Sequence, residues 1–177
     1  MPAPAKVGIV VGNPKAGSRT LALAQQVAGA AAAAAGMGTA PTVTVDLAEL
    51  GPELFDWSSS GVRQAVDAIR SCALVVVASP TYKASYTGLL KSFLDWFSTT
   101  DLLGCTVVPV MTGAGTAHAL AVEVHLRPVL VELGASLPTR GLYVTEDALP
   151  QPDDVVAAWL QAAGPLLRQA VGSAGED

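Results

Sequence analysis

The residues best suited to bind a ligand lie in three short segments, each directly after an apolar, strand-like run. The first segment is GNPKAGSRT, residues 12–20. Lys15 and Arg19 provide positive charge, Ser18 and Thr20 provide hydroxyl groups, and a helix that starts here offers free backbone N–H groups. This combination suits one terminal phosphate dianion. The alternative is an ordinary capping turn, with Ser18 as the N-cap and the basic side chains in solvent.

Two well-known nucleotide motifs are excluded in this segment. Gly12 and Gly17 have the spacing of a P-loop, but Ser18-Arg19 stand where that loop requires Lys-Ser or Lys-Thr, so no lysine would reach a β- or γ-phosphate. The dinucleotide pattern G-x-G-x-x-G fails because Asn13-Pro14 follow Gly12. The segment therefore predicts a phosphate site without nucleoside triphosphate hydrolysis.

The second and third segments have the composition of a site for a planar ring. In SPTYKASYTG, Tyr82 and Tyr86 could cover such a ring while Thr81 and Lys83 contact its edge; otherwise this is a turn with two surface tyrosines. In TGAGT, residues 112–116, small side chains allow close approach and the backbone N–H groups form a positive nest. Such a nest would stabilise a ring that gains negative charge on reduction. Together the segments predict a site for a phosphate-tailed planar cofactor.

The elements that must position these segments alternate between strand and helix. Strands are predicted at 7–11, 41–46, 73–79, 106–112 and 136–144, and helices at 19–35, 61–70, 85–97, 116–133 and 153–170. The stretch 47–60 is predicted to be mainly loop. Five strand–helix units predict an α/β protein with a flavodoxin-like, doubly wound, five-stranded parallel sheet of order 2-1-3-4-5, with helices on both faces, in a single domain spanning residues 1–177. Ligands bind at the carboxyl ends of such strands, where the three segments would meet.

Composition and charge exclude several other classes of protein. Half of the residues are hydrophobic (51%) and 14% are charged, which favours a well-filled core. The net charge of −5 argues against a nucleic-acid partner, while Lys6, Lys15 and Arg19 all precede the first acidic residue, Asp46, which favours a small anionic ligand. No apolar run is long enough for a membrane span and no secretory signal is recognisable, so we expect a cytoplasmic protein without a membrane partner. Cys72 and Cys105 are expected to be buried, unpaired thiols.

The sequence resembles the NAD(P)H-dependent FMN reductases of the flavodoxin-like superfamily, most closely the reductase components of two-component alkanesulfonate monooxygenase systems. The family pattern G-S-P-R-x-x-S-x-[ST] appears as Gly12-Asn13-Pro14-Lys15 with Ser18 and Thr20. The more specific pattern [ST]-P-x-Y-x-x-x-Y-[ST]-G-x-L-K appears at residues 79–91, and T-G-G-T-x-A-H at 112–118 with one small residue inserted or substituted. The resemblance covers roughly residues 6 to 145.

The resemblance implies a set of binding residues and no catalytic side chain. The FMN phosphate would be held by Asn13, Lys15, Ser18, Arg19 and Thr20. The isoalloxazine would lie against Pro80, Thr81, Tyr82 and Lys83, with its pyrimidine edge at Thr112, Gly113, Ala114, Gly115 and Thr116. NADPH or NADH would transfer a hydride to FMN, with the protein supplying position and electrostatics.

The resemblance also implies partners. Reduced FMN would pass to a flavin-dependent monooxygenase, and the chain would form a homodimer or homotetramer through the helices after strands 3 and 4. The helix at 85–97 is apolar on nearly all sides, which predicts an exposed apolar face on it. His118 is expected near the flavin, and His125 at a helix–helix interface where it affects assembly or flavin release. No metal site is expected, because these two histidines lie two helical turns, about 10 Å, apart without other ligands.

Two other functions stay open at this point. FMN could remain bound while electrons pass to a quinone, an azo dye or a metal oxyanion. A flavodoxin-like electron carrier is less favoured, because such carriers use a T-x-T-G-x-T phosphate loop that this chain lacks. The sequence does not distinguish NADPH from NADH.

Overall fold

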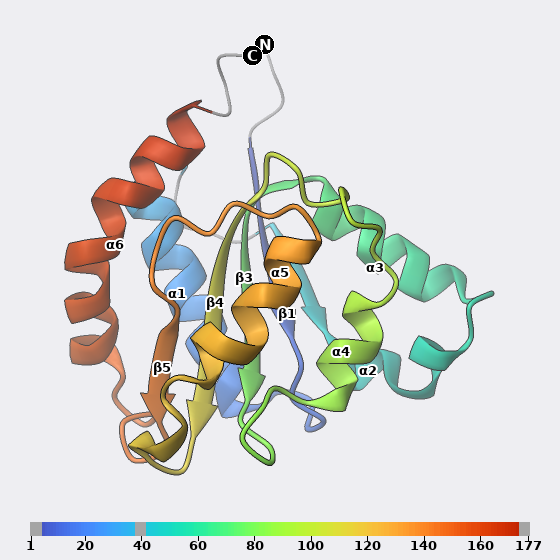
Figure 1. Ribbon diagram of the computed structural model, residues 1–177, viewed down its shortest axis with the longest axis horizontal. Helices are drawn as coiled ribbons and strands as arrows, with labels where there is room; N and C mark the ends of the chain where they lie inside the picture. Colours follow the sequence, from blue (N-terminus) through green and yellow to red (C-terminus); the bar gives the residue numbers. More distant parts are fainter. Residues whose placement is uncertain (1–4, 38–41, 174–177) are drawn as a thin grey trace.

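A parallel five-stranded sheet of order β2-β1-β3-β4-β5 runs through the protein (Figure 1). The computed structural model describes residues 5–37 and 42–173. The strands are β1 (Lys6–Val11), β2 (Val43–Asp46), β3 (Cys72–Pro80), β4 (Thr106–Gly113) and β5 (Leu142–Thr145). Every neighbouring pair is parallel, which confirms the predicted doubly wound order.

Helices cover both faces of this sheet, so its strands are apolar along most of their length. On one face lie α1 (Arg19–Ala35) and α6 (Asp153–Ser173), and on the other lie α3 (Ser60–Arg70), α4 (Gly88–Leu94) and α5 (Arg127–Glu132) (Figure 1). The arrowheads in Figure 1 all point toward the bottom of the view. The loops that follow β1, β3, β4 and β5 therefore meet at this edge of the sheet.

Helix α1 has the bounds that the sequence predicts, because both of its ends are coded locally. Ser18 caps its start, and Gly36 ends it at φ 77°, a left-handed conformation that glycine adopts readily. The buried face of α1 consists largely of alanines, which allow a neighbouring helix to approach closely. Gly164 of α6 lies close to α1, because a Cβ on it would lie 3.5 Å from the Cβ of Ala34.

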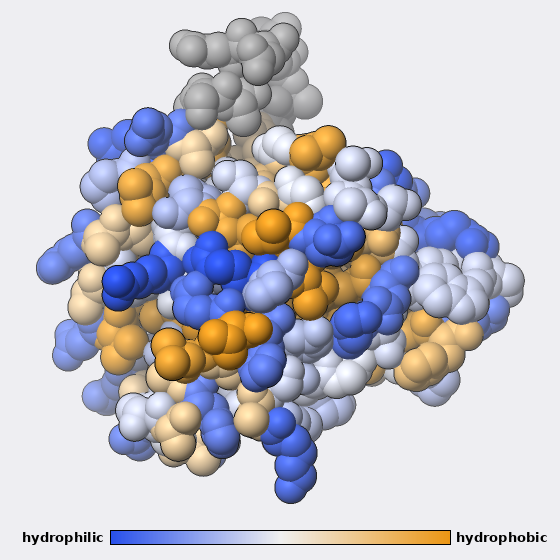
Figure 2. All heavy atoms as spheres, viewed as in Figure 1, coloured by the Kyte–Doolittle hydropathy of each residue, from blue (hydrophilic) through white to orange (hydrophobic). Residues whose placement is uncertain are grey.

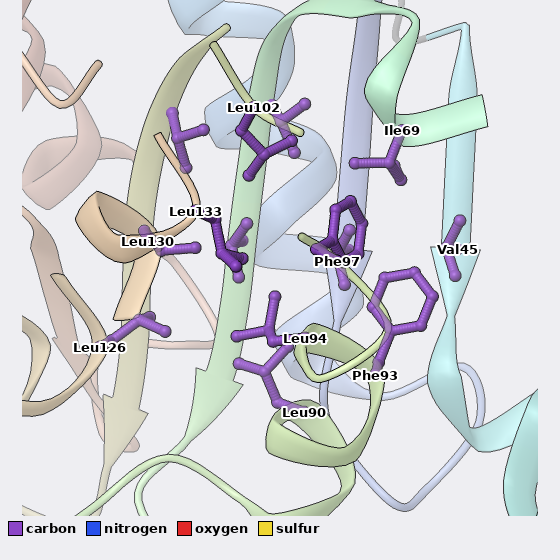
Figure 3. Close-up of a cluster of buried hydrophobic side chains, with 14 of the residues drawn as sticks. Val45, Ile69, Leu90, Phe93, Leu94, Phe97, Leu102, Leu126, Leu130 and Leu133 are labelled. Carbon is purple, nitrogen blue, oxygen red and sulfur yellow. The ribbon is translucent and has the colours of Figure 1, made fainter. Parts of the chain in front are cut away.

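The opposite face of the sheet holds the bulkier part of the core (Figure 3). Leu90, Phe93 and Leu94 of α4 are buried there, and Phe97 follows them. The predicted exposed apolar face on the helix at 85–97 is therefore wrong. The sheet covers these side chains from one side. On the other side lies the segment that contains Leu54. Trp96 donates a hydrogen bond from Nε1 to the Leu54 carbonyl (2.9 Å), which attaches this segment to the end of α4.

The segment that helps to cover α4 differs from its predicted structure. Residues 47–60 were expected to be loop, but they contain α2 (Leu47–Leu50) and a 3-10 helix, η1 (Gly51–Phe55). Both contact α4. Helix α4 is also shorter than predicted, because Thr87 caps it and the chain before Thr87 forms a tight turn.

The helix predicted at 116–133 is broken into three pieces. These are a 3-10 turn, η2 (Thr116–His118), a π-helical turn, η3 (Val122–Leu126), and α5. Pro128 has no N–H to donate to the carbonyl four residues earlier, which is a physical reason for the helix to widen just before it. His118 and His125 consequently lie on separate elements.

Two strand boundaries also differ from the prediction. The fifth strand begins at Leu142, and Ser136 forms only an isolated bridge with Thr106, because the carbonyls of Leu137 and Thr139 accept hydrogen bonds from Arg127. The second strand begins at Val43, and the predicted residue Pro41 lies outside the described residues.

The two cysteines lie near the amino-terminal edge of the sheet. Cys72 begins β3 and Cys105 precedes β4, and both are buried and unpaired, as predicted. Burial raises the pKa of the Cys72 thiol to about 11 and that of Cys105 to about 12. Among the described residues, no helix has the length and apolar character of a membrane span.

Candidate functional site

The loop after β1 is held in shape by its own side chains. Ser18 Oγ accepts a hydrogen bond from the Leu21 N–H (3.2 Å), which caps α1. Asn13 Oδ1 accepts one from the Lys15 N–H (2.9 Å), and Asn13 Nδ2 donates one to Thr20 Oγ1 (3.0 Å). Each of the two hydroxyl groups thus acts as an acceptor inside the loop and keeps its own proton to donate.

A carboxylate from the next strand also contacts this loop. Asp46, at the end of β2, accepts hydrogen bonds from the N–H groups of Gly17 (3.1 Å) and Ala48 (3.3 Å). Asp46 was not among the predicted site residues, although an Asp before a short helix is a recognisable cap. Because Asp46 occupies the Gly17 N–H, an anion in this loop would depend on the other donors.

A cavity of about 300 Å³ opens beside this loop at the carboxyl edge of the sheet. Most of its lining was predicted: Asn13, Lys15, Ser18, Arg19, Thr20, Pro80, Tyr82 and Thr112. Gly17, Glu146 and Leu149 were not predicted. Glu146 lies 3.8 Å from Arg19 in an ion pair across this cavity lining. The loop after β5, which supplies Glu146 and Leu149, has no motif from which a binding role could be predicted.

A buried network of hydroxyl groups joins the loop after β1 to the loop after β3. Thr87 Oγ1 donates to the Gly12 carbonyl (2.6 Å) and accepts from the Leu90 N–H (3.1 Å), while the Thr87 N–H donates to Ser79 Oγ (3.1 Å). Gly12 must be glycine for this approach, because a Cβ would lie 2.5 Å from the Cβ of Leu90. The serine and threonine of the second motif therefore position the two loops against each other.

The loop after β3 turns back sharply over the edge of the sheet. Tyr82 and Ser85 exchange two backbone hydrogen bonds, of 2.8 and 3.2 Å. Between them, Lys83 (φ 50°) and Ala84 (φ 66°) adopt left-handed conformations, as in a two-residue type I′ turn. Neither is glycine or asparagine, so the turn stores strain, which is typical of functional loops. Tyr82 is exposed beside the first cavity, whereas Tyr86 packs against the core and lines neither cavity described at this site.

A second cavity, of about 410 Å³, adjoins this turn. The predicted residues that line it are Thr81, Lys83, Gly113, Ala114 and Gly115. Ala84, Ala117 and Tyr143 were not predicted, and His118, which was expected near the flavin, also lines this cavity. Thr116 lines neither of these two cavities and is exposed at the start of η2. The expectation that His118 lies near the site is consistent with its place in this lining.

Thr81 and Tyr143 are two of the polar side chains that line the second cavity, together with Lys83 and His118. Thr81 Oγ1 is buried without a hydrogen-bond partner among the described residues, so it is available to a ligand. Tyr143, on β5, donates a hydrogen bond from its hydroxyl group to the Gly115 carbonyl (3.0 Å). It also covers Gly113, where a Cβ would lie 2.0 Å from the Tyr143 oxygen.

The two cavities meet consecutive residues of the two central strands. Pro80 and Thr112 line the first cavity, and the next residue along each strand, Thr81 or Gly113, lines the second. The first cavity therefore contains two basic side chains, one carboxylate and several hydroxyl groups. The second is larger and is lined mainly by small residues, with Tyr143, Lys83 and His118 beside them. Both volumes lie within the range of small-ligand pockets. This arrangement fits a ligand with an anionic end and a planar body.

Comparisons with known proteins point to one family. The sequence model described as NADPH-dependent FMN reductase matches residues 5–149. An FMN reductase (NADPH) of Pseudomonas aeruginosa is 34% identical over 148 residues, which is 82% of this chain and 80% of that protein. The NADH-dependent FMN reductase SfnF of Pseudomonas putida is 36% identical over 96 residues, 54% of this chain and 52% of that protein. The chain spans about half the length of SfnF and of two further FMN reductases, from Escherichia coli and Pseudomonas putida: the alignments cover 38% to 52% of these proteins.

A solved structure agrees over nearly the whole chain. The apo form of an NADH:FMN oxidoreductase (EMOB) superposes with a TM-score of 0.77 and 28% identity, covering 98% of this chain and 91% of that one. These relatives differ in the nicotinamide cofactor that their names specify.

Proposed function

Because the chain belongs to the NADPH-dependent FMN reductase family, as its motifs predicted, we propose that it transfers a hydride from NADPH or NADH to FMN. The observation that supports this most directly is the pair of adjoining cavities at the carboxyl edge of the sheet. One presents Lys15 and Arg19 at the start of a 17-residue helix, and the other presents the unpartnered hydroxyl group of Thr81.

In this proposal the first cavity binds the FMN phosphate. Lys15 and Arg19 neutralise its charge, and Ser18 and Thr20 donate their hydroxyl protons to its oxygens. The amino end of α1 adds the favourable field of the helix dipole. Asn13 acts mainly by holding Thr20 and the Lys15 backbone in place.

The second cavity then receives the isoalloxazine. Thr81 and Lys83 contact the ring there, and Gly113, Ala114 and Gly115 approach its pyrimidine edge. Pro80 and Tyr82 contact the ring from the neighbouring first cavity. Bound FMN supplies the hydride-accepting chemistry, so the protein needs to position the two reactants and exclude water rather than to act as an acid or base. No catalytic side chain is assigned.

We further propose that FMN is a substrate whose reduced form passes to a flavin-dependent monooxygenase. A cytoplasmic location is part of the same proposal, and two buried, unpaired cysteines fit a reducing compartment. The chain is proposed to form a homodimer or homotetramer through the helical segment after β4, where Leu120, Val124 and Val131 are exposed.

The first experiment is to follow NADPH and NADH oxidation at 340 nm while free FMN is titrated from zero. Saturable dependence on added FMN, with flavin lost on gel filtration, is the expected result. Oxidation only by flavin that stays bound, with a quinone or azo dye as acceptor, would replace the proposal by an FMN-containing reductase. No oxidation under any condition would leave an electron carrier.

The phosphate assignment has its own variant and control. Lys15→Ala should weaken FMN binding about tenfold, because it removes one of two cations from the pocket, and should leave riboflavin binding nearly unchanged. Lys6→Ala is the matched control, since Lys6 lies at the amino-terminal end of β1. Equal effects of the two variants on FMN binding would contradict the assignment.

A further inference from the structure

The proposed phosphate pocket contains an acidic side chain, whose negative charge disfavours the binding of an anion. Glu146 lines the same cavity of about 300 Å³ as Lys15, Ser18 and Thr20. Its Oε2 atom lies 3.8 Å from Nη2 of Arg19, and the two side chains are 55% and 63% exposed. An anion that enters this cavity therefore meets an arginine that already has a partner.

The fold holds the two partners on opposite sides of the cavity. Arg19 is the first residue of α1, directly after the cap Ser18. Glu146 directly follows β5, and its N–H donates to the Gly113 carbonyl (2.8 Å), which fixes its backbone against the end of β4. Strands β3 and β4 lie between β1 and β5, and Pro80 and Thr112 at their ends line the same cavity. The ion pair thus bridges the segments that would surround the ligand.

The other carboxylate at this loop has a different role. Asp46 is buried, and its two oxygens accept hydrogen bonds from the Gly17 and Ala48 N–H groups, so it serves the local backbone. Glu146 is instead paired with a cation that the proposed function assigns to the phosphate. An exposed pair of this kind contributes little to stability and opens readily. Its main effect falls on the binding of a competing anion.

We propose that Glu146 sets the residence of FMN in this site by competing with its phosphate for Arg19. The inference rests on the proposed function and deepens it, because it identifies a residue that keeps FMN exchangeable. When the phosphate binds, Arg19 exchanges a carboxylate for a dianion, so the net gain is smaller than for an unpaired arginine. The carboxylate left in the cavity also repels the dianion, which accelerates flavin release.

The test compares Glu146→Gln with Asp147→Asn, which makes the same change of charge at the next residue. Dissociation constants for FMN and for riboflavin are measured by quenching of flavin fluorescence, at low and at high salt. Glu146→Gln should bind FMN about threefold to tenfold more tightly and release it more slowly, and the gain should shrink in 1 M salt. Riboflavin binding by Glu146→Gln and FMN binding by Asp147→Asn should match the unsubstituted protein.

A double variant tests the route through Arg19. In an Arg19→Gln background, Glu146→Gln should yield a smaller gain in FMN affinity, because the competition for Arg19 is gone and only the direct repulsion of the phosphate by Glu146 is relieved. Unchanged FMN affinity in Glu146→Gln, an equal gain for riboflavin, or a full gain without Arg19 would each overturn the inference. If the unsubstituted protein binds FMN no more tightly than riboflavin, the phosphate site itself fails, which is a failure of the proposed function.

Discussion

Single residues at the carboxyl edge of the sheet are fitted to one another so closely that a methyl group matters. Gly113 and Tyr143 lie on neighbouring strands, and the Tyr143 hydroxyl group occupies the space that a side chain on Gly113 would need. The same hydroxyl group holds the Gly115 carbonyl. Tyr143 therefore determines the conformation of the loop that the sequence motif identifies.

A pair of glycine variants tests this fit. Gly113→Ala would place a Cβ 2.0 Å from the Tyr143 oxygen, so the tyrosine side chain must move and give up its hydrogen bond to the Gly115 carbonyl. We expect a loss of about 1 kcal/mol in the free energy of unfolding. Gly115→Ala is the control, because its Cβ would meet no atom within 4 Å, and its cost should stay within about 0.5 kcal/mol. Urea unfolding measures both. Similar losses in the two variants would contradict the proposed fit.

The candidate site shows what the sequence reveals at the scale of residues. Lys15, Ser18, Arg19 and Thr20 were predicted because they follow a strand directly and start a helix, and both signals are local. Tyr143 has no local signal, since its role depends on a strand pairing between distant segments. Residues of that kind become visible only when the register of the sheet is known.

At the scale of elements, an ion pair in the broken helix at 116–133 ties this segment to the next loop. Glu123 accepts hydrogen bonds from Arg127 Nε (2.5 Å) and from the Gly141 N–H (2.6 Å). Partial burial raises the pKa of Glu123, but these hydrogen bonds and the charges of Arg127 and Arg140 outweigh burial, so its pKa is below the ordinary value. The charged form of Glu123 thus stabilises the fold.

The pH dependence of stability follows from this lowered pKa. A carboxyl group with a lowered pKa contributes stability above its unfolded pKa, about 4.3, and loses it as the pH falls through the folded value. Glu123→Gln should therefore lower the free energy of unfolding by about 1 kcal/mol at pH 7. The difference should shrink as the pH falls below about 4.3 and vanish once the folded carboxyl group is protonated. Urea unfolding across this range measures the effect. Glu132→Gln, on the exposed side of α5, should show no such trend, and a pH-independent loss in Glu123→Gln would contradict the argument.

The same element explains where prediction from the sequence stops. The bounds of α1 were found because Ser18 and Gly36 act within one turn of the helix. The break near Val122–Leu126 involves Pro128 and contacts with residues up to Gly141, so an apolar periodicity alone reads as one continuous helix. Local caps are coded in the sequence, whereas interruptions that serve a neighbouring loop require the tertiary structure.

At the scale of the whole molecule, the exposed apolar surface lies on a different helical segment from the one predicted. The apolar side chains of α4 fill the core, while Leu120 (72% exposed), Val124 (55%) and Val131 (55%) lie on the segment that contains η3 and α5. Figure 2 shows apolar side chains on this face, among charged neighbours. A cavity of about 440 Å³ lies between α4 and α5, with Leu94, Pro128 and Val129 in its lining. This surface is the proposed contact between copies of the chain.

A charge placed in this surface tests the assembly. Val124→Glu should shift the protein toward monomers, because a carboxylate would become buried in an apolar interface, and sedimentation velocity at several concentrations would detect the shift. Leu166→Glu is the control, since Leu166 is also exposed but lies on α6. An unchanged sedimentation coefficient for Val124→Glu would exclude this surface as the contact.

The position of the two cysteines has a practical consequence. Their sulfur atoms are buried near the amino-terminal edge of the sheet, while the proposed ligand binds at the carboxyl edge, so an alkylating reagent and the flavin would never meet. A reagent can then modify these thiols only when the protein opens, so the rate of labelling reports how often opening occurs. At a flavin concentration one hundred times the dissociation constant, global openings become about a hundredfold rarer. The labelling rate of the two buried thiols thus reports ligand binding at the opposite edge of the sheet.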